Sequence, residues 1–126
     1  MGMWDFKPWD NDDAADWYGD FMDKTNMRNH WFEGINHDPV YDAGTVRAAA
    51  GLFIMMGRVY VWPIDHLDDD LELTINQLTK TLDCEEYKES DELLEVIQSE
   101  LDELKSRLSK KPQVESSSSK PWWKIW

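Results

Sequence analysis

Residues 46–56 read Val-Arg-Ala-Ala-Ala-Gly-Leu-Phe-Ile-Met-Met, and this stretch sets the expected fold. Wound at about 100° per residue it is apolar nearly all round, which is typical of a helix with neighbours on several sides. Its small residues let those neighbours approach closely. Asp42 or Thr45 is the expected N-cap, and Gly57, which can adopt the left-handed conformation, is the expected stop. The stretch therefore predicts a central helix that ends near Met56.

Three further helices are expected around this central one. The first runs from about Asp12 to Lys24, the next begins near Asp68, and the last runs from a Ser90 cap to about Leu108. The two later helices carry apolar stripes at three- and four-residue steps, which is the period of a helix with one buried face; these are Leu67, Leu71, Ile75, Leu78 and Leu82, then Leu93, Ile97, Leu101, Leu104 and Leu108.

The segments between these helices are expected to be irregular. Residues 26–39 contain Asn, Gly and Pro without a regular period, and they predict a polar connection. Residues 58–62 read Arg-Val-Tyr-Val-Trp, which has strand propensity but no evident partner strand, so we expect an extended connection ending at Pro63. The predicted fold class is all-α, with about four helices packed as a small irregular bundle.

The composition changes after Lys110. Residues 1–109 carry 9 basic and 25 acidic groups (−16), whereas residues 110–126 carry 4 and 1 (+3). Four consecutive serines within 112–120 are typical of a flexible linker, and the chain then reads Pro-Trp-Trp-Lys-Ile-Trp. We predict an acidic helical domain over residues 1–110, followed by a Ser-rich linker and a Trp-rich tail over residues 111–126.

Charge and cysteine content narrow the classes of function. The net charge of −13 over 126 residues argues against binding to nucleic acid, which requires clustered Lys and Arg. It suits a basic protein partner, or serves solubility alone. The single cysteine, Cys84, excludes an intrachain disulfide and a cysteine zinc cluster, and the acidic N-terminus does not resemble a signal peptide. A reducing cytoplasm is the expected location.

The first helix has two contrasting faces. Its apolar arc is expected to pack on the core, together with Trp4, Phe6 and Trp9 from a loop folded over the helix; the members of the arc are Ala14, Ala15, Trp17, Tyr18, Phe21 and Met22. The opposite arc is acidic and is expected to face water; it contains Asp12, Asp13, Asp16, Asp20 and Asp23.

The N-terminal segment resembles a bacterial family catalogued as domain of unknown function 4259. Members typically begin Met-Gly-Thr-Trp-Gly-x-Gly-Pro-Phe-Asp-Asn-Asp-x-Ala-x-Asp-Trp, and the chain matches this at Met1, Gly2, Trp4, Pro8, Asp10, Asn11, Asp12, Ala14, Asp16 and Trp17. Trp9 replaces the usual phenylalanine, while Asp5 and Lys7 replace two glycines. Two weaker likenesses, at residues 46–57 and 90–94, extend the resemblance to roughly residues 1–108. It implies a shared fold and no particular activity.

Three groups of residues have the chemistry of metal ligands. The run Asp10, Asn11, Asp12 and Asp13 offers oxygen ligands, but it departs from the EF-hand pattern, and the positive end of a helix disfavours a cation. We expect Asp10 or Asn11 to cap the helix, and Asp12 and Asp13 to complement its dipole. His30, Glu33, His37 and Asp38, and His66 with Asp65 and Asp68, form further sets, but their spacing matches no zinc motif. The expectation is therefore no metal, no cofactor and no catalytic residue.

The resulting hypothesis is a non-catalytic binding protein, of immunity or regulatory type, that engages a basic protein. Its expected binding residues come from both ends of the chain: Trp4, Trp9, Asp10, Asn11, Asp12, Asp13, Asp16, Trp17, Asp20, Trp122, Trp123 and Trp126. One alternative is a metal-dependent hydrolase that uses the N-terminal aspartates or the histidines. Another is a peripheral membrane protein held by Trp122, Trp123 and Trp126, which could instead bind a partner or fold back on the acidic domain.

Overall fold

The computed structural model describes residue 8 and residues 12–108, and this part of the chain is all-helical, without a strand. Its α-helices are α1 (Asp12–Thr25), α2 (Met27–Ile35), α3 (Ala43–Met56), α4 (Ile64–Lys80), α5 (Glu85–Lys88) and α6 (Asp91–Leu108), with a 3₁₀ turn, η1 (Thr81–Asp83), after α4. The all-α prediction is confirmed. The described residues form six α-helices where about four were expected, because α2 and the short α5 occupy segments that were expected to connect helices.

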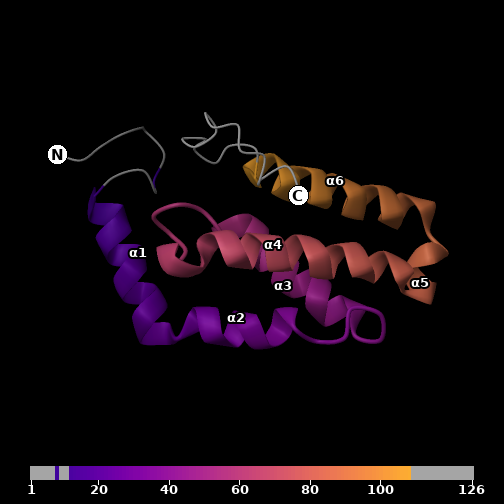
Figure 1. Ribbon diagram of the computed structural model, residues 1–126, viewed down its shortest axis with the longest axis horizontal. Coiled ribbons are helices and arrows are strands. Elements are labelled where there is room, and N and C mark those ends of the chain that lie inside the picture. The colour runs from indigo at the N-terminus through magenta and orange to yellow at the C-terminus, as the bar shows by residue number, and fades with distance from the viewer. Residues whose placement is uncertain (1–7, 9–11, 109–126) are drawn as a thin grey trace, which may run out of the picture.

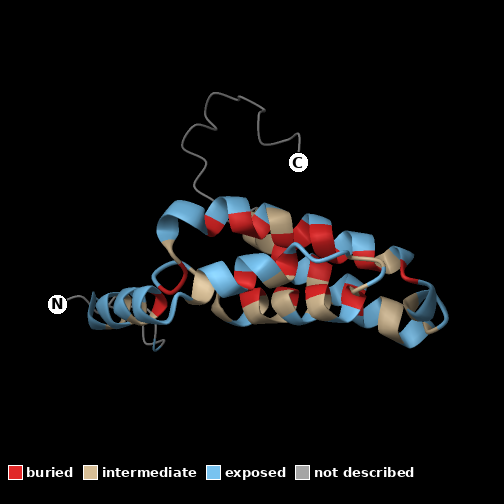
Figure 2. Cartoon of the chain, turned by 90° about the horizontal axis from the view of Figure 1, so that it is seen from below, coloured by how far each residue is buried: buried red, intermediate tan, exposed pale blue. Residues whose placement is uncertain are grey.

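The elongated body of the molecule is built around α4. This helix contacts α2, α3 and α6, and α3 contacts α2 and α6 as well. Figure 2 shows the buried residues concentrated on the facing sides of these helices. Leu67, Leu71, Ile75 and Leu78 of α4 and Ile97, Leu101 and Leu104 of α6 are buried, which confirms the two predicted stripes. From α3, Val46, Ala50 and Phe53 complete the centre of the core.

The expectation of a polar connection after α1 is wrong, because α2 occupies residues 27–35. Asn26 does interrupt the helix, with φ 55°, but only for one residue. Met27, Trp31 and Ile35 recur at four-residue steps, so they share one helix face, and all three belong to the core or pack against it. Tertiary packing of this face outweighs the poor helix propensity of Asn29 and Gly34.

The expectation of an extended connection over residues 58–62 is also wrong. The segment is a tight turn in which the backbone N–H groups of Val61 and Trp62 both donate to the carbonyl of Arg58, at 3.0 and 2.9 Å. The turn carries Val61 and Trp62 into the core. Helix α4 then begins at Ile64, four residues earlier than expected, directly after Pro63, whose fixed φ suits a helix start.

Side chains on neighbouring helices satisfy the carbonyls at two helix ends. Arg107 of α6 donates to the carbonyls of Phe53, Ile54 and Gly57 at 3.3, 2.7 and 3.2 Å, at the C-terminal end of α3. Gln77 of α4 donates to the carbonyl of Ile35 at 2.7 Å, at the end of α2. These bonds fix how the helices sit against one another, because an unpaired carbonyl is costly in a buried setting.

The predicted helix caps have mixed outcomes. Ser90 caps α6 as expected, since its hydroxyl accepts a hydrogen bond from the Leu93 N–H at 3.2 Å. Asp42 occupies the N-cap position of α3, but its carboxylate bonds to His37 rather than to a helix amide. Gly57 ends α3 with φ −81° and ψ 67°, so the expected left-handed conformation is wrong. These angles and the Arg58 N–H bond to the Met56 carbonyl describe an inverse γ-turn.

Candidate binding surface on the first helix

Helix α1 lies at one end of the molecule, at an angle to the bundle, and most of its surface faces water (Figures 1 and 2). Met22, 4% exposed, is its buried residue, and Phe21 packs partly against the core. The helix therefore docks through its last turns, next to α2. The greater part of α1 is available as a surface.

Trp17 lies outside the core, which corrects the expectation that it packs inside. Its side chain is 61% exposed and stacks on Phe21, with ring centroids 5.4 Å apart and planes 11° from parallel. Tyr18 meets the same indole edge-on at 5.4 Å. Trp17 is five residues before Met22, which puts it roughly 140° round the helix from the buried side. Met22 lies toward one side of the apolar arc, and Trp17 stands at the opposite margin of that arc, which the core does not reach.

The acidic arc of α1 is exposed, as predicted, and it adjoins the indole of Trp17. Asp13 and Asp20 lie four residues before and three residues after Trp17, and such positions are neighbours on a helix surface. Asp20 pairs with Lys24 at 3.1 Å, and both side chains of this pair are well exposed. The result is an aromatic platform with carboxylates along one edge. Such a surface can bind a cationic group, either over the indole ring or beside a carboxylate. Apolar groups of the same partner can pack against the aromatic rings.

Several predicted binding residues lie outside the described part of the chain. These are Trp4, Trp9, Asp10 and Asn11 before α1, and Trp122, Trp123 and Trp126 after α6. The capping role expected for Asp10 or Asn11 stays a prediction, as do the linker and tail. The described candidates Asp12, Asp13, Asp16, Trp17 and Asp20 all belong to α1. Asp12 and Asp13 occupy its first turn, where a carboxylate complements the helix dipole.

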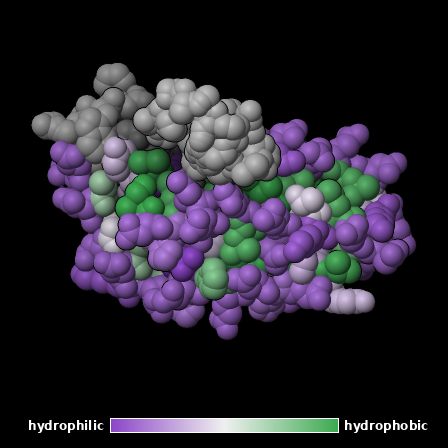
Figure 3. Space-filling view, in the orientation of Figure 1, coloured by the Kyte–Doolittle hydropathy of each residue, from purple (hydrophilic) through white to green (hydrophobic). Residues whose placement is uncertain are grey.

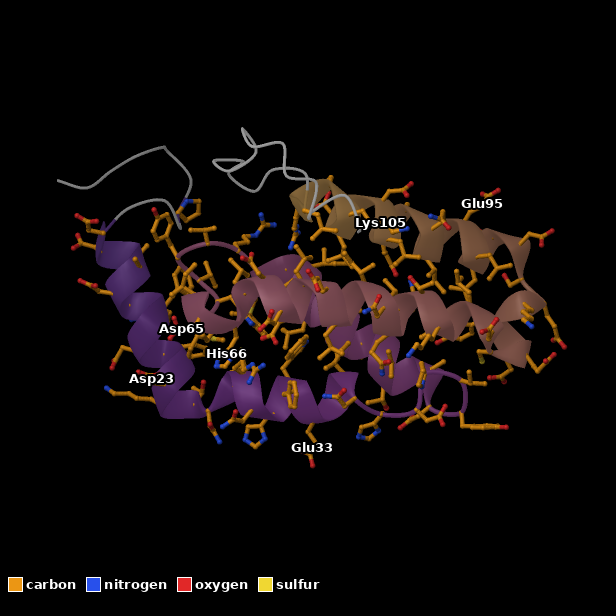
Figure 4. The ribbon with its side chains drawn as sticks, viewed as in Figure 1. Asp23, Glu33, Asp65, His66, Glu95 and Lys105 are labelled. Carbon is orange, nitrogen blue, oxygen red and sulfur yellow. The ribbon has the colours of Figure 1, made fainter. Side chains whose placement is uncertain are left out.

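The histidine sets considered as metal ligands are not assembled. Among residues 12–108, no three His, Cys, Asp or Glu side chains come close enough together to hold an ion. Figure 4 shows Glu33 pointing outward from α2, while Asp65 and His66 lie at the start of α4. His30, His37 and His66 are exposed. His37 instead bonds to Asp42, and this hydrogen bond lowers the pKa of the Asp42 carboxyl, with a smaller contribution from Thr45.

A second candidate site is an exposed hollow on the outer side of α2, most of whose lining residues are polar. The residues that line it are Asn26, Asn29, His30, Phe32, Glu33 and Asn36. Arg28 lies over the Phe32 ring at 4.6 Å, so this aromatic face is already taken by a cation from the same helix. The hollow is wide and open, and it lacks the cluster of carboxylates that α1 presents beside Trp17.

The chain matches no protein-family model, no curated protein and no solved structure. The resemblance of its N-terminal segment to the family of unknown function therefore stays a prediction. Within residues 12–108, no helix combines the length and the apolar character needed to cross a bilayer.

The acidic arc follows from the sequence, but its position beside the exposed stack of Trp17 on Phe21 was not predicted. The signal was present in the position of Trp17 at the boundary between the two arcs, next to Asp13 and Asp20. A boundary residue turns inward or outward according to how far the neighbouring helices extend. Only the packing of α1 through Met22 decides that Trp17 faces outward.

Proposed function

We propose that the protein is a non-catalytic binding module whose first helix engages a basic protein. The observation that carries this proposal is the exposed stack of Trp17 on Phe21 beside the exposed carboxylates of Asp13 and Asp20, with Asp16 on the same acidic arc. Tryptophan is enriched among the residues that dominate binding energy, because its large rigid surface is desolvated at little entropic cost. Flanking carboxylates would select a partner with Lys or Arg around an apolar contact.

The overall charge supports the same partner chemistry. A net charge of −13 attracts a basic surface over the distance of a Debye length, roughly 10 Å at 0.1 M salt. Such attraction mainly increases the association rate, while the aromatic contact holds the complex. We propose an immunity-type or regulatory role in the cytoplasm, because capture of a basic protein by an acidic surface needs no catalytic group.

A low-salt pull-down with matched variants tests this proposal. The full-length chain, D13N/D16N/D20N, Trp17→Ala and the control E72Q/E89Q/E95Q are each immobilised and exposed to the same cell extract. The control removes three exposed carboxylates outside α1, one each from α4, the turn after α5, and α6. We expect a discrete basic protein to be retained by the wild type and the control, released as salt rises, and lost from both α1 variants.

Two results would count against the proposal. One is the recovery of no basic protein at low salt, where these contacts are strongest. The other is equal retention of the same protein by D13N/D16N/D20N and by the wild type, since net charge alone would then explain the capture. Circular dichroism of each variant verifies that α1 and the bundle remain folded.

A further inference from the structure

The turn between α3 and α4 presents an exposed apolar patch, made of Met55, Val59, Tyr60 and Ile64 and called here the turn patch. These side chains are 65%, 47%, 45% and 66% exposed. They come from the end of α3, the turn and the first residue of α4, within ten residues of sequence. Figure 3 shows one hydrophobic area at the upper left, near this turn, and others toward the centre and right of the same face. Exposed apolar residues that cluster in one segment, in contrast to ones scattered singly, are typical of interaction sites.

The backbone of the turn also points to a role for its side chains. Tyr60 has φ 75°, a left-handed conformation in which glycine or asparagine costs less than an aromatic residue. The turn is held by the burial of Val61 and Trp62 and by the two bonds to the Arg58 carbonyl. The backbone geometry alone would favour glycine at position 60, so the exposed ring is the feature that tyrosine adds.

The end of α6 lies next to this turn. The guanidinium of Arg107 reaches the carbonyls of Ile54 at 2.7 Å and Gly57 at 3.2 Å, and α6 ends one residue later at Leu108. The chain therefore leaves the bundle beside the turn patch. Thirteen residues separate Leu108 from Trp122. A random coil of thirteen residues has an end-to-end distance of roughly 20 Å, which suits a contact beside the end of α6.

The C-terminal segment has the chemistry that the turn patch and its surroundings would select. Residues 120–126 read Lys-Pro-Trp-Trp-Lys-Ile-Trp, which combines four large apolar side chains with two lysines. Asp65 follows directly after Ile64, and Asp69 lies one turn further along α4; both are exposed. The N-terminal end of the chain is also rich in tryptophan, but it is not basic: residues 1–11 carry one lysine and two aspartates. Residues 110–126 carry a net charge of +3, which suits the carboxylates near the patch.

We propose that the C-terminal segment 120–126 of the same chain docks on the turn patch, with Trp122, Trp123 and Trp126 against its apolar side chains. The short linker makes this contact intramolecular, at an effective concentration in the millimolar range, so even weak intrinsic binding fills the site. The lysines lie near Asp65 and the rest of the acidic surface, and docking therefore weakens as salt rises. The inference does not depend on the partner proposed for α1.

The test compares amide and methyl NMR spectra of the full-length wild type and full-length W122S/W123S/W126S. We expect the Met55 methyl and the amides of Val59, Tyr60 and Ile64 to shift, and those of Tyr41 and Val96, exposed apolar residues elsewhere, to stay in place. The reciprocal variant Ile64→Ser should shift the indole N–H signals of the C-terminal tryptophans. Raising salt should move the wild-type spectrum toward that of the triple variant.

Three results would overturn the proposal. In the first, the turn-patch signals of the wild type and the triple variant coincide. In the second, W4S/W9S shifts these signals and the C-terminal variant does not, which would assign the patch to the N-terminal segment. In the third, the shifts vanish on dilution, which would assign the patch to a second copy of the chain. Shifts confined to the patch, independent of concentration and produced by the C-terminal variant, support it.

Discussion

Arg28 and Asp70, forty-two residues apart in sequence, form a two-pronged ion pair that joins α2 to α4. The guanidinium Nε and Nη2 donate to the two carboxylate oxygens at 2.9 and 2.7 Å, and the Trp62 indole N–H donates to the same carboxylate at 2.8 Å. Asp70 is 1% exposed. The hydrogen bonds to the Asp70 carboxylate raise the pKa of Arg28, so the guanidinium stays charged throughout the usual pH range.

Replacing Arg28 with alanine should destabilise the protein by about 3 kcal/mol, because it leaves a buried carboxylate with only the Trp62 bond. The free energy of unfolding from urea titration measures this loss. Glu72→Gln, an exposed change on the same helix as Asp70, serves as the control and should stay within about 0.5 kcal/mol of the wild type. A cost below about 1 kcal/mol for Arg28→Ala would show that water replaces the guanidinium.

Two glycines should respond to alanine in opposite directions. A Cβ at Gly57 would lie 2.5 Å from ring carbons of Phe53, which is fully buried and has no room to move, so Gly57→Ala should cost about 1–3 kcal/mol. A Cβ at Gly19, within α1, meets nothing within 4 Å, and Gly19→Ala should stabilise by about 0.5–1 kcal/mol. Thermal unfolding of both variants checks the contrast; equal effects would contradict it.

Arg107→Lys should destabilise the protein by about 1–2 kcal/mol although it keeps the charge. A lysine ammonium is a single point, and it cannot reach the carbonyls of Phe53, Ile54 and Gly57 together as the planar guanidinium does. Lys105→Gln, an exposed change on α6, is the matched control (Figure 4). If Arg107→Lys unfolds at the wild-type urea concentration, the contact between α6 and α3 does not depend on this fork.

The Asp38 carboxyl should titrate below the usual value of about 3.9. The N–H groups of Tyr41 and Val40 donate to one of its oxygens at 2.9 and 2.8 Å, and these bonds lower its pKa. A lowered folded pKa stabilises the protein above the unfolded pKa, and this contribution is lost as pH falls through the folded pKa. Carbon-13 NMR of the carboxyl gives the midpoint directly.

Asp38→Asn separates this proton linkage from the turn itself. Its amide oxygen can still accept both backbone bonds, but it does not titrate. Stability of the variant should therefore decline less than that of the wild type between about pH 5 and pH 3. A wild-type midpoint at or above about 3.9 would contradict the lowered pKa.

Local sequence sufficed for the helices whose buried faces repeat without interruption. The apolar stripes of α4 and α6 are buried from Leu67 to Leu78 and from Ile97 to Leu104, as their spacing predicts, because a long apolar stripe leaves water only by packing against another helix. The same reasoning failed at α2, where asparagine and glycine obscure the three core positions Met27, Trp31 and Ile35. The expectation at residues 58–62 was wrong as well, because these residues have high strand propensity but form a turn that buries Val61 and Trp62 in the core.

The candidate binding surface on α1 also has one feature that follows from the sequence and one that only the fold determines. The acidic arc of α1 follows from the spacing of its aspartates alone, since nothing in the chain supplies enough cations to bury them. The exposure of Trp17 does not follow from spacing, because a residue at the edge of an apolar arc is covered only if another helix extends that far. In this fold α1 packs through Met22 and Phe21 near its end, and the indole is left facing water.

By itself, the sequence determined the all-helical class, the apolar faces of α3, α4 and α6, and the acidic character of the surface, because each depends on composition and local periodicity. Only the tertiary structure decided which distant groups meet: Arg28 with Asp70, and Arg107 with the end of α3. The physical reason is that buried polar groups must be paired, and the partner of each is chosen by the arrangement of helices in space.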